Sequence, residues 1–287
     1  MIDPGLKDKV VLITGANNPY GIGAATARAF AAQNARVFLH FFRLPQAPKG
    51  TEPPPSPGPA FYQAQQGKTA DEVLDAIRRR GGQAAAWEAD LANPENIPRL
   101  FDRVEEVFGP VDILVNNAAA WKGDTFVPSG AKAVMNRFVS TVSAESHDHN
   151  FAVNSRAVAL MMAEYARRFV RRGATWGRIV NVSTDGASGF PGEVSYGASK
   201  HAMESYSRAA AVELGPYGIT VNVVAPGPVQ TGYIPPEMEE KLSAEIPLRR
   251  VGQPEDVADV IVFLASEQAR WVTGQLIYVG GGNVMPL

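Results

Sequence analysis

The residues best suited to chemistry are Tyr196 and Lys200, which stand four positions apart in a segment predicted to be helical as far as Leu214. Positions four apart on a helix share one face. A phenol has an ordinary pKa near ~10, and a neighbouring ammonium group favours the phenolate and lowers that pKa. The spacing therefore predicts a tyrosine that acts as a general acid or base.

A hydroxyl group is expected beside this phenol. Ser183 follows the apolar run Ile179 to Val182 and precedes Tyr196 by thirteen positions. The carboxyl end of a parallel strand and the start of the following helix lie at the same edge of a sheet. Ser183 is therefore predicted to hydrogen-bond a substrate oxygen that Tyr196 also reaches. Asn154 lies upstream in a predicted helix.

The elements that must position these residues alternate along the chain. Short apolar runs are each followed by a helical pattern, and continuous apolar character is typical of strands buried on both faces. This alternation predicts an α/β fold with a doubly wound parallel sheet in a single domain, residues 1–287. The seven predicted strands are Val10–Thr14, Arg36–Phe41, Ala84–Trp87, Ile113–Asn116, Arg178–Val182, Thr220–Val224 and Leu276–Val279.

Three segments interrupt this alternation. Residues 44–68 contain a proline-rich run, with seven prolines among the fifteen residues from Pro45 to Pro59, which predicts an arm or flap and not a helix. Residues 121–149 form a second insertion, and residues 229–250 are the expected substrate lid. The second insertion is predicted to contain a short helix, from the helical spacing of Ala131, Val134, Met135, Phe138, Val139 and Val142.

A glycine-rich loop, Thr14 to Gly23, joins the first strand to the first helix. Glycines at such a turn allow the backbone to approach a pyrophosphate, which is stabilised at the positive helix N-terminus. The alternative is a turn with no ligand.

The end of the second strand bears on the choice of dinucleotide. It carries no acidic residue that could bind the ribose 2′-hydroxyl group of NAD, and offers His40 and Arg43 instead, with Lys49 beyond them. Cationic donors suit a 2′-phosphate, which favours NADP(H) over NAD(H). The alternative is that Arg43 is a solvated charge at the start of a loop.

Composition excludes several classes of function. With 27 basic and 29 acidic residues the formal charge is −2, so nucleic acid and anionic membranes are not expected partners. The absence of cysteine excludes disulfides and thiolate metal sites. His147 and His149 would point apart on a helix, so no metal site is expected. No apolar run approaches the ~18 residues of a membrane span, and a soluble, cytoplasmic protein is expected.

Together these motifs resemble the short-chain dehydrogenase/reductase family over nearly the whole chain, and in general pattern the 3-oxoacyl-carrier-protein reductases. The pieces that match, in order, are the glycine loop Thr14–Gly23, Asp90-Leu91, Asn116-Asn117-Ala118-Ala119, Asn154, Ser183, Tyr196-x-x-x-Lys200 and Pro226 to Thr231. Three features depart from the family: five residues separate Gly15 from Gly21 where three are usual, the usual basic residue just before the second glycine, a common NADP determinant, is absent, and Ala119 replaces a glycine.

The resemblance implies a seven-stranded Rossmann-type sheet in the order 3-2-1-4-5-6-7 and hydride transfer between a nicotinamide and a carbonyl or secondary alcohol. Tyr196 would protonate the oxygen, Ser183 would orient the carbonyl, Lys200 would lower the tyrosine pKa and bind the nicotinamide ribose, and Asn154 would hold a proton-relaying water. The implied cofactor contacts are Gly15, Asn17, Gly21, Ile22, Gly23, Arg43, Asp90, Leu91, Asn117, Ala118, Tyr196, Lys200, Pro226, Gly227, Val229 and Thr231.

The expected substrate is a 3-oxoacyl thioester or a related ketone, and the chain is expected to form a homotetramer or a homodimer. A carrier protein could deliver the substrate by docking on the basic residues Arg167, Arg168, Arg171 and Arg172, which are otherwise a solvated helix face. The other hypotheses are an NAD-linked dehydrogenase of secondary alcohols or sugars and a catalytically silent nucleotide sensor on the same fold.

Overall fold

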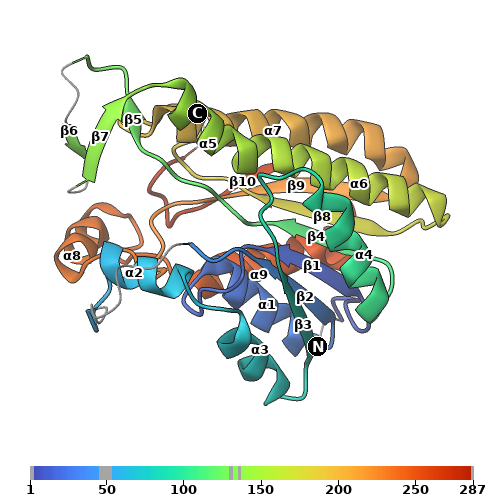
Figure 1. Cartoon of the computed structure of the whole chain (residues 1–287). Helices are drawn as coiled ribbons and strands as arrows, with labels where there is room; N and C mark the ends of the chain where they lie inside the picture. The colour runs from blue at the N-terminus through green and yellow to red at the C-terminus, as the bar shows by residue number, and fades with distance from the viewer. Residues whose placement is uncertain (1–2, 45–53, 129–131, 135–136, 286–287) are drawn as a thin grey trace.

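A seven-stranded parallel sheet forms the centre of the molecule in the computed structural model, which describes residues 3–44, 54–128, 132–134 and 137–285 (Figure 1). Its strands are β1 (Val10–Thr14), β2 (Arg36–Phe41), β3 (Gln83–Glu88), β4 (Ile113–Asn116), β8 (Gly177–Val182), β9 (Ile219–Pro226) and β10 (Leu276–Val279). Their spatial order is β10-β9-β8-β4-β1-β2-β3, and every neighbouring pair is parallel. This arrangement confirms the predicted fold class and strand order.

Helices cover both faces of the sheet (Figure 1). One face carries α1 (Ile22–Ala32), α3 (Asp71–Arg78) and α9 (Pro254–Ala265), and the other carries α4 (Asn96–Phe108), α6 (Val158–Arg171) and α7 (Val194–Leu214). Two apolar clusters fill the interfaces, one on each side of the sheet. The central strands β1, β4, β8 and β9 are buried and mostly apolar, as their sequence indicates, whereas the edge strands β3 and β10 are only partly buried.

The remaining helical elements are α2 (Pro59–Gln66), α5 (Ala144–Phe151), α8 (Pro236–Glu245) and the short segments η1 (Ala152–Ala157), η2 (Gly215–Tyr217) and η3 (Glu267–Ala269). Among the described residues, no helix has the length and apolar character needed to cross a membrane.

The second insertion contains strands where a helix was predicted. A small three-stranded sheet is built from β5 (Asp124–Thr125), β6 (Lys132–Val134) and β7 (Arg137–Thr141). The prediction of a helix is therefore wrong for the described part of this segment, and Ala131 and Met135 lie outside the described residues. The run Phe138-Val139-Ser140-Thr141 is rich in aromatic and β-branched residues, which favour strands, and that preference outweighs the helical spacing.

The proline-rich insertion ends in a helix. Residues 45–53 lie outside the described part of the chain, and α2 begins at Pro59, where a proline is well tolerated because its missing N–H would have no intrahelical partner. The backbone N–H of Gly58 donates to the carbonyl oxygen of Gly232 at 2.9 Å. Figure 1 shows α2 beside α8, so the insertion and the expected lid meet at the carboxyl edge of the sheet.

Candidate active site

The loops that follow β1 and β4 are tied together at the carboxyl edge of the sheet. The Thr14 hydroxyl oxygen accepts the backbone N–H groups of Asn117 and Ala118 at 3.0 and 2.9 Å. The Asn117 side-chain amide donates to the carbonyl oxygens of Thr14 and Gly15, at 2.9 Å each. Asn117 therefore has a structural role, and its predicted contact with a cofactor stays a prediction.

The glycine loop is built for close approach of backbone atoms. Gly15 has φ +70°, and a Cβ atom there would lie 2.7 Å from the Ala118 Cα atom. A Cβ atom on Gly23 would lie 2.5 Å from the Gly15 carbonyl oxygen. Larger residues are therefore excluded at both positions.

The first turn of α1 suits an anion. Gly21 is the N-cap residue and supplies no side-chain cap, and no acidic residue stands in the first turn formed by Ile22 and Gly23. The backbone N–H groups of this first turn therefore have no side-chain acceptor, and the helix dipole favours negative charge there. These features fit the pyrophosphate of a dinucleotide.

Asn17 and Asn18 hold the segments that border this loop. The Asn17 side chain donates to the carbonyl oxygens of Gln66 and Lys68, at 3.0 and 2.8 Å. The Asn18 side chain donates to the Thr231 carbonyl oxygen at 3.1 Å. Asn17 and Asn18 therefore connect the glycine loop to the insertion and the lid, and a direct contact of Asn17 with a cofactor stays a prediction.

The end of β2 differs in one respect from expectation. Burial lowers the pKa of His40 to about 4, and its Nε2 atom lies 2.7 Å from the Ala89 carbonyl oxygen. His40 is therefore neutral at pH 7 and supplies no positive charge to a phosphate. Arg43 is half-exposed and forms an ion pair with Glu88 at 2.8 Å, which lowers the pKa of that carboxyl group.

The loops after β3 and β9 complete the expected cofactor side. The Asp90 carboxylate accepts the N–H of Ala92 at 2.8 Å, and Leu91 is buried against the cluster beneath α4. Pro226 ends β9, and a Cβ atom on Gly227 would lie 2.8 Å from the Gly280 Cα atom. The structure adds two contacts of the lid, a bridge between Val229 and Gly252 and the bond from Asn18 to Thr231.

Tyr196 and Lys200 lie on α7, as predicted, but their electrostatics differ from expectation. Lys200 is 3% exposed, its Nζ atom donates to the Val182 carbonyl oxygen at 2.8 Å, and burial lowers its pKa to about 8. The Nζ atom lies 5.9 Å from the centre of the Tyr196 ring. The pKa of Tyr196 is raised, chiefly by burial and further by Glu193, Tyr62 and Asp185. In the protein alone, burial and these neighbours outweigh the lysine, so the phenol is protonated at neutral pH.

Asn154 is fully buried in η1, the π-helical turn between α5 and α6. Its side-chain amide donates to the Ala120 carbonyl oxygen at 2.8 Å and to the Ser199 hydroxyl at 3.0 Å, and its oxygen accepts the Ala120 N–H at 2.9 Å. Asn154 thus joins the loop after β4 to α7 beside Lys200. Its water-holding role stays a prediction.

The Ser183 hydroxyl has a partner that sequence reasoning missed. It donates to the Glu204 carboxylate at 2.6 Å, in the buried interface between β8 and α7. Glu204 stands eight positions beyond Tyr196, about 12 Å along the helix axis. The next residue, Thr184, is half-buried, and its hydroxyl oxygen accepts the Gly186 N–H at 3.4 Å. Ser183 and Thr184 both carry a hydroxyl group at the end of the strand, and this pair in the sequence could have made Thr184 a second candidate for orienting the carbonyl.

Asp124 was also missed, and it fixes the start of the helix that carries Tyr196. Its buried carboxylate accepts the backbone N–H of Ser195 at 2.8 Å and the Ser146 hydroxyl at 2.7 Å. The second insertion therefore contacts α7 one residue before the phenol. No feature of the sequence near Asp124 indicates this contact, which depends on the small sheet.

Known proteins are similar to this chain in sequence and in fold. The family model described as enoyl-(acyl carrier protein) reductase matches residues 58–283. The uncharacterized oxidoreductase YjdA of Bacillus subtilis is 32% identical, with 97% of this chain and 98% of that protein covered. The hydroxynaphthalene reductase-like protein Arp2 of Metarhizium acridum is 32% identical, with 99% and 97% covered.

A solved structure agrees with these sequences. A mutant short-chain dehydrogenase/reductase from Serratia marcescens superposes with a TM-score of 0.76 at 27% identity, covering 97% of this chain and 98% of that one. The family of the chain follows from its sheet order, from the tyrosine and lysine on α7 and from these relatives together: it belongs to the short-chain dehydrogenase/reductases.

Proposed function

We propose that the protein is an NADP(H)-dependent reductase of ketones. The observation that carries this proposal is the placement of Tyr196 and Lys200, which lie on one helix at the edge of the sheet where the glycine loop opens. When bound, the nicotinamide ring supplies hydride to the carbonyl carbon. The chain supplies the proton and the groups that orient the substrate.

Tyr196 is the proton donor in this proposal. Because the pKa of the phenol is raised in the protein without cofactor, its oxygen carries the proton at neutral pH, as a donor to the carbonyl oxygen must. Lys200, with a pKa lowered to about 8, can exchange protons at neutral pH. Asn154 joins the segments that hold Lys200 in place.

The group that orients the carbonyl comes from the end of β8, where Ser183 was expected. For Ser183 to do this, its hydroxyl must leave Glu204 and so break a buried hydrogen bond to a carboxylate. The Thr184 hydroxyl makes weaker contacts, because it accepts the Gly186 N–H at 3.4 Å and interacts with the Asp185 carboxylate. We include both residues in the proposed site, and the paired variants described in the Discussion distinguish them.

Arg43 supports NADP(H). Its guanidinium is half-exposed at the end of β2, and a 2′-phosphate could replace the Glu88 carboxylate as its partner. The same ion pair favours the second candidate, an NAD-linked dehydrogenase, because Arg43 is already neutralised by Glu88. A catalytically silent sensor is disfavoured, since it would have no use for Asn154, Ser183, Tyr196 and Lys200 together.

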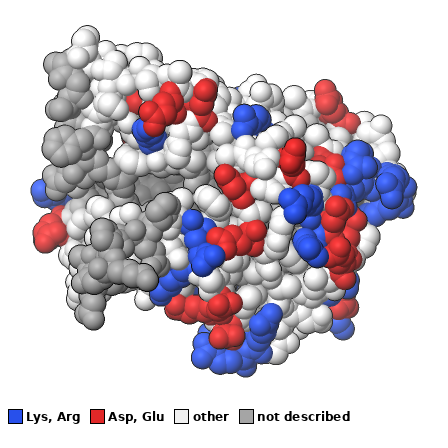
Figure 2. All heavy atoms as spheres, viewed as in Figure 1, with Lys and Arg blue, Asp and Glu red and all other residues white. Residues whose placement is uncertain are grey.

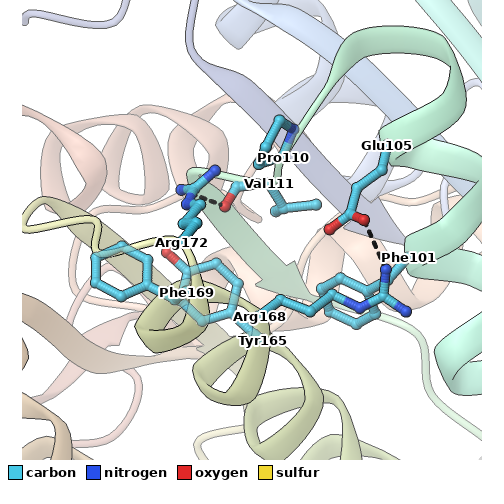
Figure 3. A pocket seen from close by; sticks show the side chains of 8 residues that line it. All are labelled: Phe101, Glu105, Pro110, Val111, Tyr165, Arg168, Phe169 and Arg172. Atoms are coloured by element: carbon cyan, nitrogen blue, oxygen red, sulfur yellow. Dashed lines mark hydrogen bonds and ion pairs between the residues drawn. The ribbon is translucent and has the colours of Figure 1, made fainter.

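The substrate is proposed to be a free small molecule. The expected resemblance supports a 3-oxoacyl thioester and the family-model description an enoyl thioester, whereas the name of Arp2 points to a hydroxylated ring system. Delivery by a carrier protein is less well supported, because three of the four arginines, Arg167, Arg168 and Arg172, are paired with carboxylates, and only Arg171 has no ion pair among the described residues. Arg168 forms ion pairs with Asp102, Glu105 and Glu164 within 2.7 Å, and Figure 3 shows the pair with Glu105.

Arg167 and Arg172 are paired as well, with Glu164 at 2.6 Å and Asp112 at 3.0 Å. Figure 2 shows acidic and basic side chains interspersed on the side of the molecule that α4 and α6 form. An acidic partner would meet no single-sign surface there. The pocket between α4 and α6 in Figure 3 is lined by Arg168 and Arg172 among others, and it is too small to hold a substrate.

The test is a panel of 3-oxoacyl thioesters, cyclic aryl ketones and simple aliphatic ketones, assayed with NADPH and NADH at matched concentrations. We expect consumption of NADPH with formation of the corresponding secondary alcohol, identified by chromatography. Faster turnover with NADH would favour the alternative. No turnover of any carbonyl compound, with NADP still bound, would reject an enzymatic role. The homo-oligomer and the cytoplasmic location stay predictions.

A further inference from the structure

Asp185 brings a carboxylate into the candidate active site that sequence reasoning did not single out. It follows β8 by three residues, and its backbone N–H donates to the Pro226 carbonyl oxygen at 3.0 Å, so its place is fixed between β8 and the loop after β9. Its Oδ2 atom would lie 3.1 Å from a Cβ atom on Gly227. The carboxylate is also close enough to Tyr196 to raise the pKa of the phenol.

The Asp185 carboxylate is held without being neutralised. The Asn283 side-chain amide donates to its Oδ2 atom at 2.8 Å, and Thr184 and the Gly186 N–H contribute weaker interactions. Within the described part of the chain, no lysine or arginine forms an ion pair with it. A carboxylate has about four acceptor positions, so an oriented acceptor remains for a donor group on a ligand.

Aromatic side chains lie near the start of α7, and one of them contacts the same phenol. The Phe190 ring lies 6.2 Å from the Tyr196 ring in an edge-to-face arrangement, and Tyr62 of α2 is close enough to affect the Tyr196 pKa. The Trp121 Nε1 atom donates to the Glu193 carboxylate at 2.6 Å, which places this indole at the start of α7. Flat aromatic walls favour a flat ligand.

We propose that Asp185 determines substrate specificity by accepting a hydrogen bond from a hydroxyl group of a ring ketone, such as a hydroxylated bicyclic aryl ketone. The proposal rests on the proposed function and deepens it. An acyl chain brings no donor, and its binding would partly desolvate the carboxylate without compensation. A ring hydroxyl would donate a hydrogen bond to the carboxylate and so offset its desolvation, while the ring packs on the aromatic residues. Asp185 would then select for hydroxylated rings over acyl chains.

Binding can be tested without turnover. 2-Naphthol and 2-methoxynaphthalene have the same ring system and differ in a donor hydrogen. We expect the NADP-bound protein to bind 2-naphthol about 10- to 100-fold more tightly by calorimetric titration, the range expected for a hydrogen bond to a charged group. Equal affinities would overturn the proposal.

Turnover provides the second readout. The hydroxy-2-tetralones, each compared with its methoxy counterpart, should show at least one position at which kcat/KM favours the hydroxyl compound about tenfold or more. If no ketone is reduced but 2-naphthol is still preferred, the proposed function fails and the role of Asp185 stands. If the ketones are reduced with no preference for the hydroxyl group, the role of Asp185 fails and the proposed function stands.

Two variants locate the preference. Asp185→Asn keeps the size of the side chain and removes the charge, so the preference for the hydroxyl ligand should fall to about threefold or less. Asn283→Ala removes the partner of the carboxylate but keeps the carboxylate, so most of the preference should remain. An equal loss in both variants would mean that Asp185 only holds the C-terminal segment. Unchanged melting temperature and NADP affinity confirm that each variant is folded.

Discussion

The cofactor side and the substrate side of the candidate site are built by different means. On the cofactor side, the site is formed mainly by backbone atoms. Gly15 and Gly23 allow neighbouring backbone segments to approach closely, and the first turn of α1 presents its N–H groups. On the substrate side, side chains from distant segments meet at α7, including Asp124 from the second insertion and Tyr62 from the first. The contrast teaches that the cofactor side can be recognised from a local glycine motif, whereas the substrate side depends on side chains from distant segments that no local motif indicates.

Removing the lysine should affect the substrate side most. Lys200→Met is expected to lower kcat by about 10²- to 10⁴-fold, the usual contribution of acid–base catalysis, because the proton on Tyr196 can no longer be resupplied through the ammonium group. The affinity for NADP, followed by fluorescence of the bound dinucleotide, should weaken less. If kcat and NADP affinity fall by the same factor, Lys200 acts on cofactor binding as much as on proton transfer, and the comparison fails at this residue.

The pH dependence of the wild-type protein tests the same group. Lys200 loses its proton as the pH rises through about 8, so kcat/KM for reduction should fall there, and Lys200→Met should lack this inflection. The folded-state pKa is below the unfolded value of 10.5, so the unfolded chain binds more protons between pH 8 and 10.5. The free energy of unfolding should therefore rise with pH in that window relative to Lys200→Met.

Two paired variants sharpen the assignment at the end of β8. Thr184→Val and Ser183→Ala each remove one hydroxyl group, and the one that orients the carbonyl should cost about 10²-fold in kcat, as loss of a single oriented donor does. Because Ser183 bonds Glu204, we expect the larger loss in kcat from Thr184→Val and a lower melting temperature from Ser183→Ala. The reverse pattern in kcat would assign the role to Ser183.

Asp124 tests whether the second insertion positions the catalytic helix. Asp124→Ala removes both carboxylate oxygens, so the Ser195 N–H and the Ser146 hydroxyl lose this acceptor. We expect a loss of about 1 to 3 kcal/mol in the free energy of unfolding, measured with denaturant, and about a tenfold lower kcat. Ser146→Ala removes only the second contact, so it should lower stability with less effect on kcat. Equal effects on kcat would contradict positioning through Ser195.

The smallest expected effects lie at the end of β2, on the cofactor side. Arg43→Ala should raise the KM for NADPH about tenfold and leave NADH kinetics nearly unchanged, because only the phosphate contact is lost. Glu88→Gln releases the guanidinium from its ion pair, so the KM for NADPH should fall a few-fold. Equal changes for both dinucleotides in Arg43→Ala would show that Arg43 does not bind the phosphate.

The same contrast explains what the sequence could predict. The strands and the position of Tyr196 and Lys200 on one helix follow from local patterns, and the structure confirms them. The helix predicted from the spacing of Ala131 to Val142 is wrong for the described residues, because β-branched residues outweigh an apolar spacing of the helical kind. The bond from Ser183 to Glu204 and the contact of Asp124 with Ser195 join residues 21 and 71 positions apart, and no local pattern reports such pairs.

Electrostatics at Tyr196 were also beyond sequence reasoning. The spacing of Tyr196 and Lys200 suggested a lowered phenol pKa, but burial affects both groups, and Glu193 and Asp185 add negative charge nearby. Burial of each side chain is a property of the folded chain. The His40 imidazole shows the same limit, since its position suggested a cation and its burial makes it neutral.

The most direct test of the proposed chemistry is a single-turnover reduction of a ketone from the panel, with NADPH bound to the wild-type protein and to Tyr196→Phe. The phenylalanine keeps the ring and removes only the group that carries the proton. The rate of alcohol formation should fall by at least about 10³-fold while NADPH affinity stays within a few-fold. A Tyr196→Phe protein that forms the alcohol at near the wild-type rate would contradict the account.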